Sequence, residues 1–184
     1  MKTTKLTSWH FALVLAAVVL FLTDRNNPSA SPAEIPAQTW QVYFSPHGGA
    51  TSAIVRALDQ ATESIWVQAY SFTSIPIAEA LVRAQGRGLA VRVILDRSQK
   101  TEKYSAVGFL SKHGIIIGID AAHAIAHNKV IIIDNEIAIS GSFNFTRAAE
   151  ERNAENLMII HDRELAARFL DNWWIHQKHS TLFR

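Results

Sequence analysis

The chain of 184 residues contains no cysteine, is 48% hydrophobic and has a formal net charge of +2. This length is enough for one domain with a hydrophobic core, and the lack of cysteine excludes disulfides, thiolate metal ligands and a cysteine nucleophile. Without residues 1–30 the chain has 15 basic and 15 acidic residues, so net charge gives no argument for nucleic-acid binding.

Residues 1–30 have the pattern of a signal peptide. Lys2 and Lys5 precede the apolar run Phe11–Leu22, whose 12 residues are fewer than the about 20 that a membrane-spanning helix needs. Small residues at 28–33 offer cleavage positions, so we expect export to the periplasm or the medium. An uncleaved membrane anchor is the alternative, and it would place the protein at a membrane. Residues 31–39 are expected to be a linker and residues 40–184 the folded domain.

Strand and helix patterns alternate along residues 40–184. Short apolar or alternating runs predict strands at 40–44, 64–71, 91–95, 115–119, 130–133, 136–140 and 156–160. Helical spacing of apolar residues predicts helices from Thr51 or Ser52 to about residue 61, and over 74–85, 100–113 and 163–177. This order predicts an α/β fold in which helices flank a mixed central β-sheet.

The most informative stretch runs from His127 to Glu155. His127 and Lys129 are two positions apart and are expected to lie on the strand of Val130–Ile133, so the imidazole and the ammonium should lie on one face. The same alternation places Ser142 and Asn144 together and turns Phe143 and Phe145 toward the core. An imidazole, an ammonium, a hydroxyl and a carboxamide on one surface suit the binding of a phosphate group. Gly141 lacks a Cβ and is predicted to let a ligand approach the backbone.

The spacing H-x-K-x4-D-x6-G-S-x-N, from His127 to Asn144, resembles the HKD signature of the phospholipase D superfamily. The single copy is most similar to the Nuc-type, EDTA-resistant bacterial endonucleases. This resemblance implies a phospholipase D-like sandwich in a single domain that forms a homodimer. It also implies phosphodiester hydrolysis through a phosphohistidine, with no metal and no other cofactor.

The resemblance also assigns roles to the catalytic candidates His127, Lys129, Asp134 and Glu155. His127 is the nucleophile, and Lys129 screens the phosphate charge with help from Ser142 and Asn144. Glu155 stands where the family has a carboxylate that orients the histidine. Asp134 belongs to the signature, but its position in a turn favours a structural role.

One histidine cannot be the neutral nucleophile and the protonated acid in the same step. The chain has a single motif, so we expect a two-fold homodimer that brings two copies of His127 into one site. His123 and His127 are four residues apart, but the neighbouring Lys129 would repel a cation, so no metal ion is expected there.

The favoured function is an endonuclease that cleaves DNA with little sequence preference, and RNA remains open as a second substrate. Cleavage of phospholipid head groups by the same chemistry is the first alternative, and nucleic-acid binding without turnover is the second. Seven basic residues and two acidic ones lie between Arg83 and Lys112. They predict either a surface for a polyanion or an ordinary solvated helix face.

Overall fold

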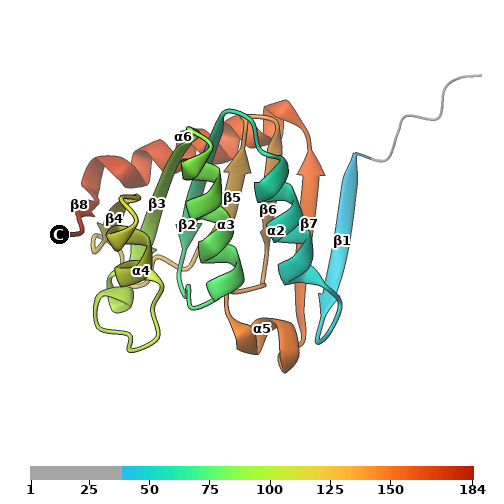
Figure 1. Cartoon of the computed structure of the whole chain (residues 1–184), viewed down its shortest axis with the longest axis horizontal. Helices are drawn as coiled ribbons and strands as arrows, with labels where there is room; N and C mark the ends of the chain where they lie inside the picture. Colours follow the sequence, from blue (N-terminus) through green and yellow to red (C-terminus); the bar gives the residue numbers. More distant parts are fainter. Residues whose placement is uncertain (1–38) are drawn as a thin grey trace, which may run out of the picture. The chain divides into compact units, whose positions relative to one another are not determined.

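The computed structural model describes residues 39–184, and the predicted signal peptide and nearly all of the predicted linker lie outside this range. An eight-stranded sheet runs through the described domain in the order β1-β7-β6-β5-β2-β3-β4-β8 (Figure 1). Its strands are β1 Trp40–Ser45, β2 Ser64–Ala69, β3 Ala90–Asp96, β4 Ile116–Asp120, β5 Lys129–Ile133, β6 Ile137–Gly141, β7 Glu155–His161 and β8 Thr181–Leu182.

The sheet contains both parallel and antiparallel strand pairs. Helical crossover connections join β2 to β3 and β3 to β4, and only these pairs are parallel. Strands β2, β3 and β4 are parallel, whereas each of the other neighbouring pairs is antiparallel. The helices are α2 Ala50–Gln60, α3 Ile75–Gly86, α4 Val107–Lys112, α5 Arg147–Glu151 and α6 Arg163–His179, and a short 3-10 helix η2 spans Arg97–Lys100. The predicted α/β class with helices flanking a mixed sheet is therefore confirmed.

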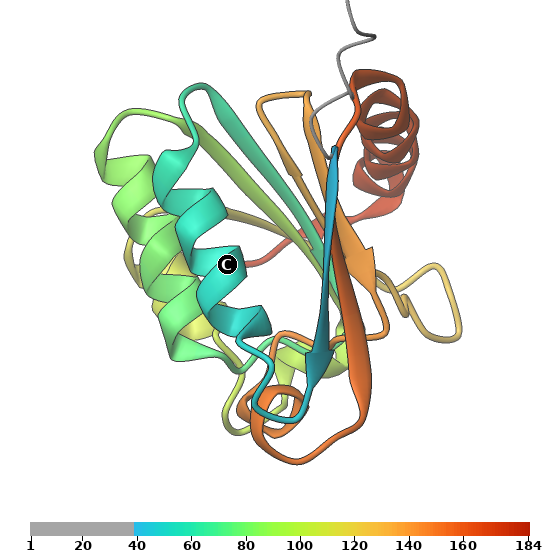
Figure 2. The same cartoon turned by 90° about the vertical axis from the view of Figure 1, so that its right-hand side faces the viewer.

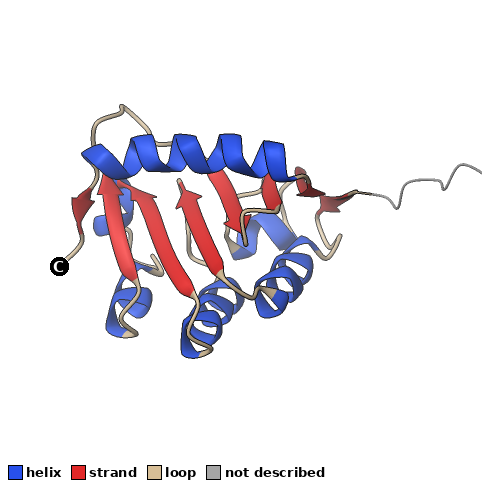
Figure 3. Cartoon of the chain, turned by 90° about the horizontal axis from the view of Figure 1, so that it is seen from above, coloured by secondary structure: helices blue, strands red, loops and turns tan. Residues whose placement is uncertain are grey.

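Helices cover the sheet on both faces. Helices α2, α3 and α4 pack on one face, and α6 lies across the other (Figures 2 and 3). All five residues of β5 are buried, as expected for a central strand covered from both sides. On the α6 face, Trp173 is fully buried and its Nε1 donates a hydrogen bond of 2.9 Å to the carbonyl of Val67.

Three local features differ from the sequence prediction. The helix expected over 100–113 is only α4, because residues 101–106 form turns after η2. The N-cap of α2 is Gly49 rather than Thr51 or Ser52, and the Glu150 carboxylate accepts the backbone N–H groups of Gly49 and Thr51. Helix α5 and strand β8 were not predicted; both are too short to give a periodic signal. Within residues 39–184, none of the helices has the length and apolar character needed to cross a membrane.

Candidate active site

Most of the predicted site residues gather at the end of the sheet where β2 and β6 finish and β5 and β7 begin, here called the motif end. The register pairs Ala69 with Lys129 and Ser45 with Glu155, so residues far apart in sequence meet there. His127 lies two residues before β5 rather than on the strand, which corrects the prediction of a strand through both motif residues. Its exposed imidazole packs against Tyr70, with ring centroids 4.6 Å apart.

Lys129 is the one buried lysine in the described domain, with 6% of its surface exposed. Its Nζ donates a hydrogen bond of 2.9 Å to the carbonyl of His127 and lies 5.4 Å from the Tyr70 ring centroid. Burial lowers the pKa of Lys129, and the negative charge of Glu155 offsets part of this effect. A cation held in such a low-dielectric position interacts strongly with an incoming phosphate.

Ser142 and Asn144 follow β6 and supply neutral polar groups. The Ser142 Oγ accepts a hydrogen bond of 3.0 Å from the Asn156 N–H, which leaves its own O–H able to donate. The Asn144 Oδ1 is buried and has no hydrogen-bond partner among the described residues. Phe143 and Phe145 are fully buried, which confirms the predicted alternation. The Ser142 hydroxyl can thus donate to a ligand oxygen, whereas the unpartnered Asn144 Oδ1 can only accept a hydrogen bond.

Gly141 is required by the neighbouring strand rather than by a ligand. A Cβ at this position would lie 2.3 Å from the carbonyl oxygen of Asn156, and the backbone φ is +151°. The close approach of β6 and β7 therefore explains the glycine, and this replaces the prediction that it admits a substrate.

Glu155 begins β7 at the motif end. Its N–H donates to the Ser45 Oγ at 3.2 Å, and its carboxylate accepts a hydrogen bond of 3.1 Å from the Asn153 side chain. No hydrogen bond joins Glu155 to His127 within the described chain. The charge of Glu155 acts on Lys129 instead, so the role of Glu155 in orienting the histidine stays a prediction.

Asp134 lies at the opposite end of β5 from His127. Its two carboxylate oxygens accept four hydrogen bonds of 2.8–3.0 Å from the backbone N–H groups of Thr62, Glu63 and Ser64 and from the Thr62 hydroxyl. Burial raises the pKa of Asp134, but these hydrogen bonds together outweigh it and hold the pKa below its usual value. The structure thus separates Asp134 from the other candidates and gives it a structural connection to the start of β2.

Replacing Asp134 with asparagine is expected to destabilise the fold by about 1–3 kcal/mol at neutral pH, because charge-assisted hydrogen bonds are lost. The pKa of Asp134 is lower in the folded protein than in the unfolded chain. The stabilisation is therefore fully present at pH above the unfolded pKa and disappears as pH falls through the folded pKa. Urea unfolding of both proteins at neutral and acidic pH would measure the difference, with Asp171→Asn on exposed α6 surface as the control. A variant of normal stability but without activity would instead place Asp134 in the chemistry.

The basic residues between Arg83 and Lys112 do not form one surface. Arg83 forms an ion pair with Asp59, and Arg87 donates to the carbonyls of Leu58 and Ala61, both away from the motif end. Arg97, by contrast, follows β3 at the motif end and donates to the carbonyl of Ala124 in the segment that leads to His127. Lys100 and Lys103 follow Arg97 and are exposed.

Sequence comparison agrees with this geometry. A family model described as cardiolipin synthase, PLD-like domain, matches residues 54–174. The chain belongs to the phospholipase D superfamily. It is therefore a hydrolase that acts on phosphodiester bonds. Among solved structures, the phospholipase D family member Nuc from Salmonella typhimurium has 38% identity and a TM-score of 0.75, and the match covers 79% of this chain and 97% of Nuc.

Named relatives of this superfamily member come from bacteria and mammals. A Rickettsia conorii protein named phospholipase D is 50% identical over 164 residues, which are 89% of this chain and 82% of that protein. A Rickettsia felis protein of the same name is 52% identical over 130 residues, 71% of this chain and 65% of that protein. Human mitochondrial cardiolipin hydrolase is 34% identical over 147 residues, 79% of this chain and 58% of that protein. The chain thus spans less than two thirds of the last two relatives.

Two groups of residues were not predicted as functional. Tyr70, at the end of β2, contacts both His127 and Lys129, and only the pairing of β2 with β5 reveals this contact. Asp120 and three histidines from separate parts of the chain form a second polar cluster. His176 and His179 are three residues apart in α6, and this spacing could have indicated a shared site. The sequence did not show which other residues they would contact.

Proposed function

We propose that this phospholipase D superfamily member is a metal-independent endonuclease that hydrolyses DNA with little sequence preference. The observation that carries the proposal is the grouping of exposed His127, buried Lys129 and the Ser142 hydroxyl at the motif end, a set of groups suited to a phosphate. Such a site contacts phosphate only, so RNA is open as a second substrate. The likeness to Nuc over 97% of its chain supports the proposal.

The proposed reaction has two steps. An imidazole nitrogen of His127 attacks phosphorus, the P–N bond forms as the P–O bond to the leaving group breaks, and a second, protonated histidine gives its proton to the leaving alkoxide. Lys129 neutralises the non-bridging oxygens, with Ser142 and Asn144 donating hydrogen bonds. Water then attacks phosphorus and gives a proton to the second histidine, the P–N bond breaks, and His127 is restored.

The second histidine is proposed to be His127 of the partner subunit in a two-fold homodimer. Each described chain has a single motif, and His127 is exposed at its surface, where a second copy can approach. In a symmetric dimer the same patch meets itself, so the two histidines face each other across the axis. One of the two must be neutral to attack phosphorus, and the other must be protonated to supply the leaving group with a proton.

Nucleic acid is favoured over lipid by the surroundings of the site. Four of the six residues that line the shallow pocket beside Ser142 and Glu155 are polar, and Phe44 is its one large apolar side chain. A cleft for acyl chains would be expected to be more apolar. Exposed Arg97, Lys100 and Lys103 follow β3 at the same end of the sheet and suit a polyanion. An exported protein would meet DNA outside the cytoplasm, and export remains part of the proposal.

Phospholipid head-group cleavage is the second candidate, because several relatives are named phospholipase D or cardiolipin hydrolase. Incubating the purified full chain with supercoiled plasmid in excess EDTA tests the first candidate. Conversion to nicked and linear plasmid is expected. Loss of cleavage in EDTA by protein that circular dichroism shows to be still folded would contradict the phosphohistidine mechanism. Release of head groups from phospholipid vesicles without plasmid cleavage would favour the lipid substrate.

A further inference from the structure

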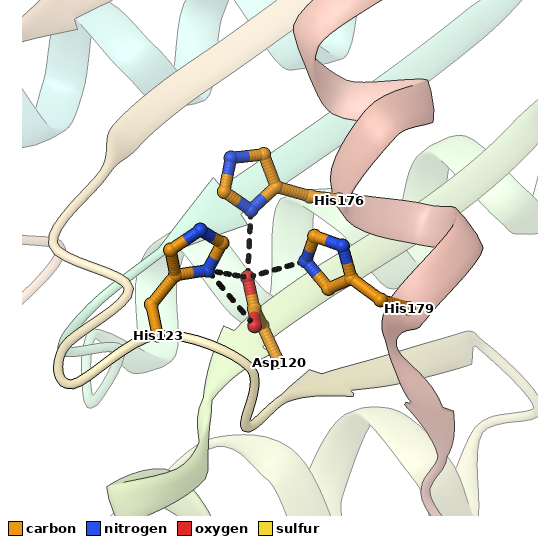
Figure 4. Close-up of side chains that lie close together, drawn as sticks. All are labelled: Asp120, His123, His176 and His179. Atoms are coloured by element: carbon orange, nitrogen blue, oxygen red, sulfur yellow. Dashed lines mark hydrogen bonds and ion pairs between the residues drawn. The ribbon is translucent and has the colours of Figure 1, made fainter.

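A cluster of three histidines surrounds one buried carboxylate at the end of β4, in addition to the residues of the candidate active site. Asp120 has a fully buried side chain, and its Oδ2 lies 2.6 Å from His176 Nδ1, 3.2 Å from His179 Nε2 and 3.2 Å from His123 Nδ1. Figure 4 shows all three rings directed at this carboxylate. Three histidine nitrogens thus surround one carboxylate oxygen, and these four atoms lie within 4.8 Å of one another.

The cluster joins parts of the chain that are distant in sequence. Asp120 ends β4, and His123 lies in the segment between β4 and β5. His176 and His179 are three residues apart near the C-terminal end of α6, so both lie on the same side of that helix. The Ala122 N–H donates to Asp120 Oδ1 at 3.0 Å, which orients the carboxylate and leaves Oδ2 for the histidines.

Hydrogen bonding alone accounts poorly for three imidazoles at one oxygen. The His123 ring centroid is 4.9 Å from that of His176 and 5.2 Å from that of His179, so three imidazolium ions here would repel one another. A single carboxylate would cancel only one of their charges. Neutral imidazoles would each have to direct their one N–H to the same acceptor. A divalent cation resolves this conflict, because neutral imidazoles can then direct lone pairs inward.

The donor set and its dimensions fit a first-row transition metal. Histidine nitrogen and carboxylate oxygen are preferred ligands of Zn²⁺, which binds them at about 2.0–2.2 Å in tetrahedral sites, so adjacent donor atoms lie about 3.3 Å apart. The three distances from Asp120 Oδ2 range from 2.6 to 3.2 Å, and all four candidate ligand atoms lie within 4.8 Å of one another. Modest ring movements would therefore complete the geometry. The side chains of His123 and His179 are 48% and 32% exposed, which provides a path for the ion.

We propose that Asp120, His123, His176 and His179 bind a divalent transition-metal ion, with Zn²⁺ the best fit. Four protein ligands close the coordination sphere, which is typical of a structural rather than a catalytic zinc site. The ion would connect the C-terminal end of α6 with the segment between β4 and β5. This segment contains His123 and, four residues later, His127. His127 and Lys129 are not ligands, so the proposal is independent of the proposed nuclease function and compatible with metal-independent cleavage.

The test measures metal content and stability without substrate. The full chain is purified in mild detergent with a histidine-free tag, stripped with a chelator and dialysed against Zn²⁺ or Co²⁺. We expect one Zn²⁺ per chain by elemental analysis, the visible absorption of four-coordinate Co²⁺, and a rise of about 5 °C or more in the unfolding midpoint. Absence of bound Zn²⁺ in the folded, reloaded wild type would overturn the proposal.

His123→Ala is the decisive variant, because His123 is half-exposed on a connecting segment and its removal leaves the core intact. It is expected to bind Zn²⁺ about 100-fold or more weakly, as is His179→Ala, because each removes a ligand. His161→Ala, which removes an exposed histidine of β7, is the matched control and should bind one ion normally. Equal Zn²⁺ binding by His123→Ala and wild type, or equal weakening in His161→Ala, would show nonspecific binding and contradict the site.

Discussion

Replacing His127 with alanine is expected to lower phosphodiester cleavage on the order of 10³-fold or more, because the phosphohistidine can no longer form. The imidazole is exposed and makes no side-chain hydrogen bond within the described chain, so the fold should be unaffected. Plasmid nicking by equal amounts of folded protein measures the loss. His161→Ala, an exposed histidine at the far end of β7, should cleave at the wild-type rate.

Mixed dimers extend this prediction to the proposed shared site. Co-expression of equal amounts of wild type and His127→Ala would give about one quarter wild-type homodimers if subunits pair at random. If each site needs both histidines, total activity should be about 25% of the wild-type value. If each chain works alone, about 50% should remain. A result near 50%, or a monomer with full activity, would contradict the shared site.

Replacing Lys129 with methionine is expected to reduce turnover on the order of 10²–10³-fold while the stability stays equal or increases. Methionine has a similar volume but no charge, so the phosphate oxygens lose their buried cation. Burial lowers the pKa of Lys129 on folding. At any pH below the pKa of the unfolded chain, the buried charge therefore destabilises the fold, and methionine removes this destabilisation. A loss of activity without a loss of stability would distinguish a functional lysine from a structural one.

The pH profile of the wild type provides a second measurement for Lys129. Activity requires the ammonium form of Lys129 as well as the protonated histidine, so it should fall as pH rises. A decline at high pH that is missing from the residual activity of Lys129→Met would belong to Lys129, whose folded pKa lies below the ordinary lysine value because of burial. Lys112→Met, which removes an exposed lysine of α4, is the matched control and should leave both rate and stability near the wild-type values. Equal turnover by Lys129→Met and wild type would exclude the proposed screening of phosphate charge.

The strands, the long helix α6 and several site residues could be predicted from the sequence, because they depend on interactions between residues that are close together in the chain. Strand alternation acts over neighbouring residues, so it predicted buried Phe143 and Phe145 and the two polar side chains beside them. Apart from Asp134, the motif residues lie at or just beyond the ends of β5 and β6. A short turn joins these strands, so His127, Lys129, Ser142 and Asn144 come together at one end of the sheet. Periodicity also predicted the principal strands and the long helix α6, because each buries a regular apolar face.

Long-range pairing decided what the sequence left open. The four hydrogen bonds of Asp134 come from residues about 70 positions earlier, and Tyr70 reaches His127 only because β2 pairs with β5. The Asp120 cluster needs α6 to cross the sheet and bring His176 beside the end of β4. Sequence by itself determined the residues of the motif and the class of fold. The sequence also favoured a structural role for Asp134, but only the tertiary structure showed its partners and assembled the histidine cluster, because sheet order and helix packing depend on contacts between distant segments.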